Sequence, residues 1–365
     1  MGESTESIDA DPAIATPPPD PSSDPSAPRE VPARAATIYD VATAAGVSHQ
    51  TVSRFLKGFE GIRPETRAKV VKALDELGYR PNLTARSLKS GRSHRIGALT
   101  HEISQYGPSR IAEGASAAAR EAGYVLDLVS LDAHNPRAIE ESLELITQHN
   151  LAGILALAST DEMKRAFETT AFRVPAFIAA ESDILTDAEP AGSTGAGMPA
   201  LIGHLALLGH RDVVHIAGPQ TWSAARNRLR AYTAAIEHAG LRSRAVLRGD
   251  WSAKSGYDAI AALEELPEAT AYVAANDQMA LGAMLALKQR GLHIPDDVSV
   301  AGVDDTPEAA YFDPPLTTLR LDFEAQGRAA IQALLSRIEP DVRTAAPLAA
   351  PGLIVRKSTG TAPPS

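Results

Sequence analysis

The chain has 365 residues, of which 44% are hydrophobic, 22% are charged and none is cysteine. This composition is ordinary for a globular protein, and at roughly 150 residues per domain the length predicts two or three domains. The lack of cysteine excludes disulfide scaffolds, thiolate zinc sites, iron–sulfur clusters and cysteine nucleophiles. No apolar run approaches the ~20 residues of a membrane helix, and residues 1–6 carry no secretory or myristoylation signal, so we expect a cytoplasmic protein without membrane contact.

The net charge of −10 is distributed unevenly along the chain. Residues 37–95 carry eleven Lys and Arg against five acidic residues, whereas the regions on either side are acidic. A small basic module beside a large acidic body favours contact between that module and a polyanion. Residues 1–35 contain eight prolines and almost no large apolar side chain, so we expect a disordered tail there.

Residues 36–81 have the pattern of three short helices. Gly46 can supply the positive φ of a tight turn between the first two, and Ser48 is placed to cap the second. Pro64 occupies the first position of the third helix. The pattern therefore predicts a compact three-helix module.

The predicted second helix has one polar face. Four polar residues form two i,i+4 pairs on adjacent rows of this helix: His49 with Ser53, and Gln50 with Arg54. Glutamine and arginine can make bidentate contacts to adenine and guanine in the major groove. A merely solvated helix face is the alternative, but within a basic module we favour a recognition helix.

From about residue 94, apolar strand-like runs alternate with amphipathic helices. This alternation predicts parallel sheets that are covered on both faces. The number of predicted strands is larger than one sheet of ordinary size would hold, and the stretch 181–199 is rich in Gly, Asp and Pro, as a boundary between two sheets would be. We therefore predict two lobes with a cleft. Ligands bind beyond the carboxyl ends of such strands, which draws attention to the residues after Ala275 and Val303. The strands are expected at 96–100, 125–131, 153–158, 176–180, 213–217, 271–275 and 298–303.

Short motifs in both the module and the body point to one known family. They are Tyr39-Asp40-Val41-Ala42, Ala45-Gly46-Val47-Ser48-His49-Gln50-Thr51-Val52-Ser53-Arg54, Gly78-Tyr79-Arg80-Pro81-Asn82, Ala217-Gly218-Pro219, Ala275-Asn276-Asp277-Gln278, Asp304-Asp305-Thr306 and Pro314-Pro315-Leu316-Thr317-Thr318. Together they resemble the LacI/GalR family of transcription regulators over about residues 37–357. The resemblance implies an α/β chain with a helix-turn-helix domain at 36–81, a hinge helix and linker at 82–93, a two-lobed periplasmic-binding-protein-like body of doubly wound parallel sheets at 94–357, and a flexible C-terminus at 358–365.

The resemblance implies a homodimer whose two recognition helices enter successive major grooves of a near-palindromic double-stranded operator. The hinge helix would fold only on DNA, with Leu88 wedged into the minor groove at the operator centre. His49 and Arg63 depart from the residues of relatives, which leaves the operator sequence open. The DNA-contacting residues that the resemblance implies are Ile38, Tyr39, Ser48, His49, Gln50, Thr51, Ser53, Arg54, Lys57, Asn82, Ala85 and Leu88.

The resemblance also implies a small-molecule effector, often a sugar, between the lobes. Arg228, Asn276 and Asp304 would hydrogen-bond to sugar hydroxyls, and two aromatic residues would supply apolar or stacking faces. The first-lobe donors of a sugar-binding relative align with Ala133 and Leu157, and Glu181 could substitute only after a one-residue shift in register. The effector-contacting residues that the resemblance implies are Gly107, Pro108, Ile111, Glu181, Arg228, Trp251, Asn276, Asp304 and Phe323.

The sequence thus predicts a nucleoid-associated repressor of a carbohydrate-utilisation operon that a sugar, with a galactoside as one candidate, releases from DNA. The C-terminus lacks leucine heptads, which predicts a dimer rather than a tetramer. No cofactor or metal is expected, and the lack of a Gly-rich phosphate loop, a Gly-x-Ser-x-Gly elbow or histidines at metal spacing disfavours an enzyme. Two alternatives stay open: a regulator with a non-sugar corepressor, and, disfavoured by the helix-turn-helix, a sugar-binding transport protein.

Overall fold

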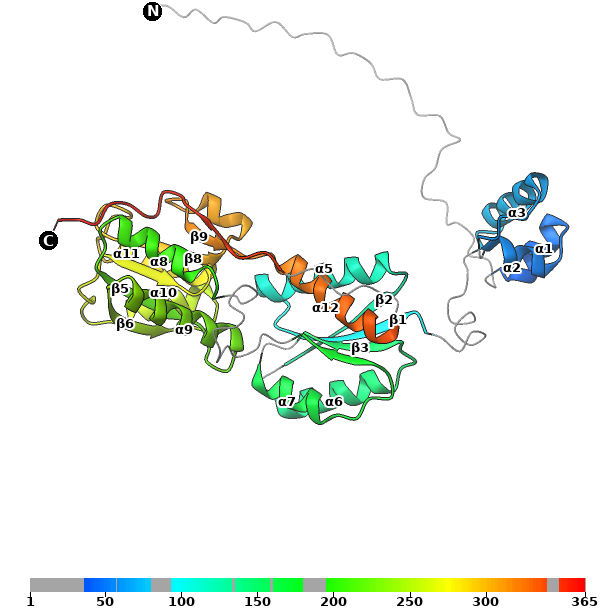
Figure 1. The fold of residues 1–365 in the computed structure, drawn as a ribbon, viewed down its shortest axis with the longest axis horizontal. Coiled ribbons are helices and arrows are strands. Elements are labelled where there is room, and N and C mark those ends of the chain that lie inside the picture. Colours follow the sequence, from blue (N-terminus) through cyan, green and yellow to red (C-terminus); the bar gives the residue numbers. More distant parts are fainter. Residues whose placement is uncertain are drawn as a thin grey trace, which may run out of the picture. The chain divides into compact units, whose positions relative to one another are not determined.

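The computed structural model describes residues 36–56, 58–79, 93–132, 135–157, 160–179, 195–339 and 348–364. The chain divides into two units, residues 1–82 and 83–365, which we describe separately (Figure 1). The tail predicted at 1–35 and nearly all of the hinge and linker predicted at 82–93 lie outside the described residues. Within the described ranges, no helix combines the length and the apolar character that a membrane crossing requires.

Three helices make up the described part of the first unit: α1 (Ile38–Ala45), α2 (His49–Leu56) and α3 (Pro64–Glu76). Thr37 and Asp40 form a reciprocal capping box at the start of α1, and Gly46 ends it with a φ of 64°. Ser48 Oγ accepts a hydrogen bond of 3.2 Å from the Thr51 amide at the start of α2. The three helices share one small core, formed by Val41, Ala42, Ala45, Val52, Val70 and Ala73.

The first lobe of the second unit is a four-stranded parallel sheet in the order β2-β1-β3-β4. Its strands are β1 (Arg95–His101), β2 (Val125–Leu131), β3 (Gly153–Ala156) and β4 (Ala176–Ile178), and its helices are α5 (Tyr106–Glu121), α6 (Pro136–Thr147), α7 (Asp161–Thr169) and α12 (Phe323–Ile338). Although α12 comes from the far end of the chain, it packs beside α5 on one face of this sheet, with α6 and α7 on the other (Figure 1).

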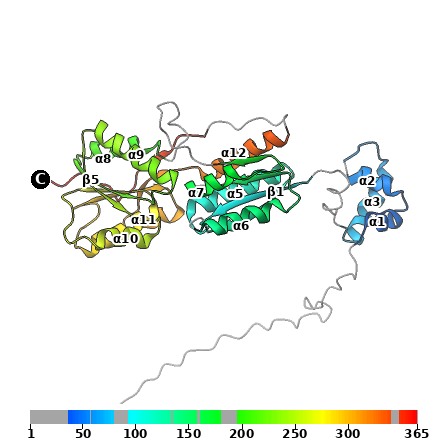
Figure 2. The same cartoon turned by 90° about the horizontal axis from the view of Figure 1, so that it is seen from below.

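The second lobe is a six-stranded sheet in the order β10-β9-β8-β7-β5-β6. Its strands are β5 (Asp212–Ala217), β6 (Arg242–Arg248), β7 (Ala271–Ala274), β8 (Ser299–Asp304), β9 (Thr317–Arg320) and β10 (Gly352–Ile354), and its helices are α8 (Met198–Leu207), α9 (Ser223–His238), α10 (Ala253–Ala261), α11 (Asp277–Gln289) and the short 3₁₀ helix η1 (Pro307–Tyr311). Helices α8 and α9 cover one face, and α10 and α11 cover the other (Figure 2). All its strand pairs are parallel except β9 with β10.

The predicted α/β class with two parallel sheets is confirmed, and each of the seven expected strands is present within a few residues. Sequence reasoning missed β6, β9 and β10. Strand β6 lies at an edge of the sheet, and five of its seven residues, three of them arginines, are exposed, so it lacks the apolar run of a central strand. Strands β9 and β10 have four and three residues, too few for a periodic pattern.

The predicted flexible C-terminus at 358–365 is wrong for residues 358–362. Ser358 is fully buried, donates from Oγ to the Val300 carbonyl at 2.6 Å and accepts from the Thr317 amide at 2.8 Å. Further along, the Ala362 amide donates to the Leu208 carbonyl at 2.8 Å. The small polar and proline residues of this segment are typical of a flexible terminus. Here, the hydrogen bonds of Ser358 and Ala362 hold the segment against the second lobe.

Two glycines allow α5 and α12 to lie in close contact. A Cβ atom on Gly327 of α12 would lie 2.0 Å from the Ile111 carbonyl oxygen, and one on Gly114 of α5 would lie 2.1 Å from the Glu324 carbonyl oxygen. Both distances are far inside van der Waals contact, and the atoms met are backbone. Any side chain at either position must therefore push the two helices apart.

We expect Gly327→Ala to lower the free energy of unfolding by about 1–3 kcal/mol, the usual cost of overpacking. Gly203→Ala is the matched control, because Gly203 lies inside α8 and a Cβ atom added there would have no neighbour within 4 Å. There the substitution should stabilise the protein by about 0.5–1 kcal/mol. Urea denaturation of both variants measures the difference, and equal effects would contradict the close helix contact.

Candidate functional site

The predicted recognition face of α2 is accessible to solvent. Tyr39, Ser48, His49, Gln50 and Arg54 are exposed, whereas Val52 on the opposite side of α2 is fully buried. The remaining described residues of the predicted set, Ile38, Thr51 and Ser53, are half-buried. Lys57, Asn82, Ala85 and Leu88 lie outside the described residues. The first unit therefore presents one polar, groove-sized helix face supported by an apolar core.

Two side chains of this face are positioned by aromatic neighbours. The His49 ring lies 5.2 Å from the Tyr39 ring, measured between centroids. The Arg54 guanidinium lies 5.6 Å from the centre of the Phe59 ring, within cation–π range. Phe59 was not among the predicted residues, although a half-exposed phenylalanine just after the recognition helix is a signal that could have found it.

In the second unit, eight of the nine predicted effector residues line a single pocket between the lobes. They are Gly107, Pro108, Ile111, Arg228, Trp251, Asn276, Asp304 and Phe323, and Glu181 lies outside the described residues. The pocket encloses ≈ 720 Å³, including its open mouth. Sequence reasoning missed the other lining residues, Gln105, Tyr106, Ala179, Trp222, Ser223, Ala224, Gln278 and Gln326. Gln278 is the last residue of the family motif after β7, and Trp222 lies three residues beyond the motif after β5, so both stand close to a usable signal.

A buried ion pair lies at the second-lobe side of the pocket. Arg228 Nη2 of α9 and Asp304 Oδ1 at the end of β8 are 3.1 Å apart, and both side chains are less than 8% exposed. Arg228 also donates to the Ala275 carbonyl, and its guanidinium lies 5.4 Å from the centre of the Trp251 ring. Burial raises the pKa of Asp304 to about 6 while Arg228 opposes the rise, so the pair is largely ionised and neutral overall at pH 7.

Asn276 and Trp251, which both line the pocket beside the Arg228–Asp304 pair, are joined by a hydrogen bond. Asn276 Oδ1 caps α11 by accepting from the Met279 amide at 2.9 Å, and its Nδ2 donates to the Trp251 carbonyl at 2.9 Å. Trp251 has a φ of 76°, and its ring fills the space beside Gly218, where a Cβ atom would lie 2.5 Å from it. Trp222 meets it edge-on with centroids 5.6 Å apart. The two tryptophans therefore form a fixed aromatic wall.

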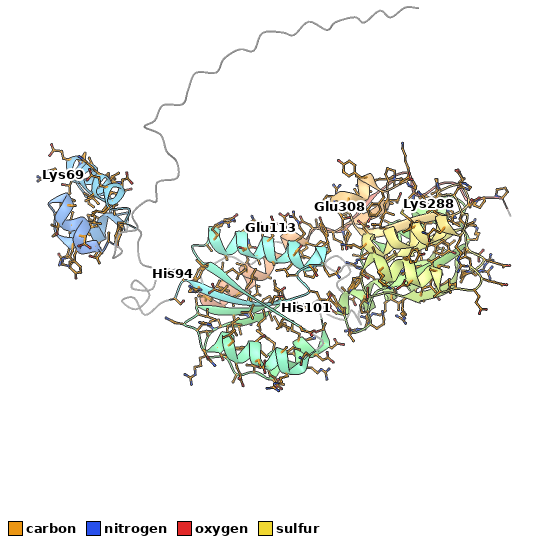
Figure 3. The ribbon with its side chains drawn as sticks, turned by 180° about the vertical axis from the view of Figure 1, so that it is seen from behind. Lys69, His94, His101, Glu113, Lys288 and Glu308 are labelled. Carbon is orange, nitrogen blue, oxygen red and sulfur yellow. The ribbon has the colours of Figure 1, made fainter. Side chains whose placement is uncertain are left out.

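The lobes are in direct contact with one another. Arg226 of α9 makes a bidentate ion pair with Asp161 of α7, with N–O distances of 2.8 and 2.9 Å. His101 lies at the end of β1 nearer the second lobe (Figure 3). The centroid of its ring is 4.8 Å from that of the Trp222 ring. These contacts join elements of the two lobes, and one of the residues involved, Trp222, lines the pocket.

Asp277 is fully buried at the start of α11, behind the pocket. It accepts hydrogen bonds from the Thr306 amide at 2.8 Å and the Thr318 hydroxyl at 2.6 Å. Burial, followed by the nearby Asp304 carboxylate, raises the pKa of Asp277 to about 8. Asp277 is thus mainly uncharged at neutral pH and serves the packing of the second lobe. Among the described residues, no group of three or more His, Asp or Glu could hold a metal ion.

An exposed recognition helix, joined in one chain to a two-lobed α/β body with a pocket between its lobes, defines a DNA-binding regulator with a ligand-binding body. Two family models match the chain: "Bacterial regulatory proteins, lacI family" over residues 37–82 and "Periplasmic binding protein-like domain" over residues 202–359. The chain belongs to the LacI family of bacterial transcription regulators. It is therefore a DNA-binding transcription regulator and not an enzyme.

Named relatives support this membership. The chain is 33% identical over 325 residues to the lactose operon repressor of Escherichia coli (strain K12), which covers 88% of this chain and 90% of that protein. It is 33% identical over 313 residues to the ribose operon repressor of the same strain, covering 83% and 93%. A solved structure of the lac repressor dimer bound to operator and the anti-inducer ONPF matches with a TM-score of 0.75 at 31% identity, over 90% of this chain and 100% of that one.

We expect Asp277→Asn to alter how stability depends on pH. Because the folded-state pKa lies near 8 and the unfolded value near 4, the folded wild type binds the extra proton between these pH values and loses stability as pH rises through that window. Asparagine mimics the protonated acid but does not titrate. Urea denaturation between pH 5 and pH 8 measures the free energy of unfolding of both proteins. The difference between the variant and the wild type should change in favour of the variant by up to about 1.4 kcal/mol per pH unit. A constant difference would contradict the raised pKa.

Proposed function

We propose that the protein represses transcription as a homodimer on a near-palindromic operator, and that a sugar in the interlobe pocket releases it from DNA. The observation that carries the effector part is the Arg228–Asp304 pair beside an aromatic wall. Sugars need bidentate donors and acceptors for vicinal hydroxyls and an aromatic surface for their C–H face. The pocket supplies both.

The charge of the pocket favours a neutral ligand. Among the described lining residues the charged ones are Arg228 and Asp304, which neutralise each other, and the other polar groups include the amides of Gln105, Gln278 and Gln326. An anionic corepressor would need an uncompensated cation, since burying a charge without a partner is costly. This supports a sugar over an acidic corepressor, as do relatives named for the lactose and ribose operons.

Release from DNA requires a difference in affinity between two states. An effector shifts the equilibrium only if it binds the state with low operator affinity more tightly than the other. A pocket formed by two lobes meets this requirement, because a change in their separation alters the contacts of the ligand. A galactoside is the first candidate, given the similarity to a lactose operon repressor.

Both tryptophans of the chain line the pocket, so intrinsic fluorescence should report effector binding. We expect a saturable emission change with one member of a panel of lactose, methyl β-D-galactoside, ribose, glucose and maltose. Arg228→Met should weaken that binding roughly 100-fold, the loss of about 3 kcal/mol expected when a buried charged hydrogen-bond donor is removed. Arg242→Met is the matched control, because Arg242 lies exposed on β6.

A flat response to the whole panel, from protein that still binds its operator, would refute the sugar effector and favour a different corepressor. Binding that survives Arg228→Met unchanged would place the sugar elsewhere.

We expect Gln50→Ala to weaken operator binding by about 1–3 kcal/mol and to relax specificity at one base position of each half-site. Lys72→Ala is the control, since Lys72 lies exposed on α3 and pairs with Glu76. Duplexes selected from a randomised pool provide the operator, and fluorescence anisotropy at fixed salt gives affinity and stoichiometry. A single chain per duplex would contradict the homodimer, and equal losses in both variants would contradict the recognition role of α2.

A further inference from the structure

The turn that follows β8 has an unusual backbone. Asp304 and Asp305 are consecutive non-glycine residues with positive φ values of 116° and 55°. Such conformations are strained for L-residues and persist where the surroundings enforce them. Because Asp304 is the carboxylate of the pocket, whatever enforces this turn also fixes the direction of the pocket carboxylate.

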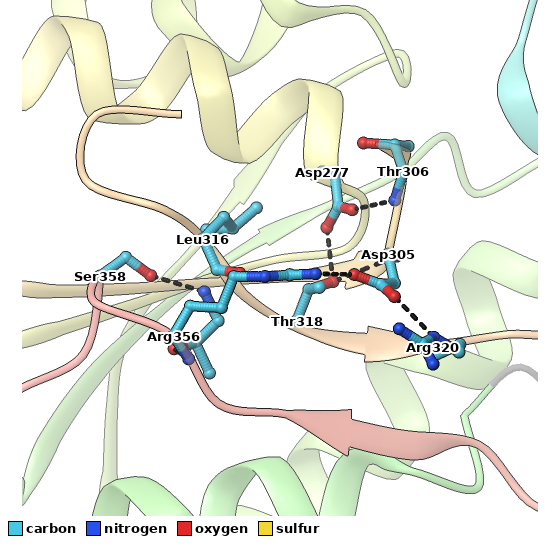
Figure 4. A network of polar contacts seen from close by, with 9 residues as sticks. Asp277, Asp305, Thr306, Leu316, Thr318, Arg320, Arg356 and Ser358 are labelled. Carbon is cyan, nitrogen blue, oxygen red and sulfur yellow. Dashed lines mark hydrogen bonds and ion pairs between the residues drawn. The ribbon is translucent and has the colours of Figure 1, made fainter. Parts of the chain in front are cut away.

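The Asp305 carboxylate is held on both oxygens. Arg356 Nη2 donates to Oδ1 and Arg320 Nε donates to Oδ2, each at 2.6 Å (Figure 4). On the other side of the turn, the Thr306 amide donates to Asp277 at 2.8 Å. The turn is thus tied to β9, to α11 and to the segment after β10.

The two arginines are not equivalent partners. The Arg356 side chain is 18% exposed, and its Nη1 also donates to the Leu316 carbonyl at 2.8 Å. Its backbone amide donates to the Thr317 hydroxyl at 2.9 Å, which fixes the segment itself. Arg320 is 61% exposed. Exposed ion pairs contribute little, whereas breaking a buried one leaves an uncompensated charge, so Arg356 should be the effective partner.

We propose that Asp305 and Arg356 are positioning residues for effector binding: their ion pair holds the turn after β8 so that Asp304 faces Arg228 in the pocket. Neither residue lines the pocket among the described lining residues. Their effect on a ligand passes through the backbone of Asp304. The structural part of this inference stands by itself, and its consequence for sugar affinity rests on the proposed function.

Crystal structures without any sugar test the structural part. In Arg356→Gln we expect the 304–306 turn to relax and Asp304 Oδ1 to leave the 3.1 Å contact with Arg228 Nη2. In Arg320→Gln, the matched control, the turn should stay as it is. An unchanged turn in Arg356→Gln would overturn the proposal.

Asp305→Asn is a second variant that tests the same ion pairs if Arg356→Gln does not fold. It removes the partner of both arginines without leaving a buried anion, and asparagine tolerates positive φ well. Relaxation of the turn in this variant therefore reports the lost ion pairs rather than an unsuitable residue. A turn that keeps its conformation in Asp305→Asn would also count against the proposal.

Calorimetric titration with methyl β-D-galactoside tests the consequence by a double-mutant cycle. Arg356→Gln should lower affinity by tenfold or more in the wild-type background but by less than twofold in an Asp304→Ala background, because the positioned group is then missing. Equal losses in both backgrounds would show a general structural role and contradict positioning. If the wild type binds no galactoside, the galactoside part of the proposed function fails, while the crystal structures still decide the positioning claim.

Discussion

The ion pair between Arg228 and Asp304 joins elements that are far apart in sequence and defines the second-lobe side of the pocket. Its partners come from α9 and from the end of β8, and the Ala275 carbonyl at the end of β7 accepts a further hydrogen bond from Arg228. Removing two charges from water is expensive, and this cost is offset only by good geometry and by satisfied neighbours. The hydrogen bonds of Asn276, Asp277 and Asp305 hold the elements around the pair in place, which makes the second lobe a preorganised half of the site.

The path of the chain distributes this site over both lobes. After β9 the chain enters α12, whose close contact with α5 through Gly114 and Gly327 makes it part of the first lobe. The chain then returns to the second lobe as β10, and Arg356 follows two residues later. Phe323, the first residue of α12, and Gly107 on α5 therefore reach the pocket from the first lobe. The segments that cross between the lobes thus supply both a wall of the pocket and the arginine that holds the turn after β8.

Much of this arrangement was predictable from sequence, for identifiable reasons. Apolar runs marked the central strands, and motifs at strand ends marked Asn276 and Asp304, because parallel sheets place ligands there. Trp222 and Tyr106 were missed because an aromatic residue in a loop or in the first turn of a helix is equally typical of the hydrophobic core. The fastening of Ser358 was missed because its hydrogen bonds go to β8 and β9, which no local pattern encodes. The departure of Asp304 and Asp305 from ordinary backbone geometry is likewise set by distant arginines.

The division of chemistry between the lobes bears on how an effector could discriminate between two states. The charged lining residues Arg228 and Asp304 belong to the second lobe, whereas the helices of the first lobe contribute uncharged residues, both apolar ones such as Pro108 and Ile111 and the amides of Gln105 and Gln326. On the proposed function, contacts of the ligand to the Arg228–Asp304 pair persist when the lobes move, and contacts to the first-lobe residues change. Moving an equilibrium from 1:99 to 99:1 takes a difference of roughly 10⁴-fold in affinity between the states. The second lobe would then set which ligand binds, and the first-lobe wall would set how strongly that ligand distinguishes the two states.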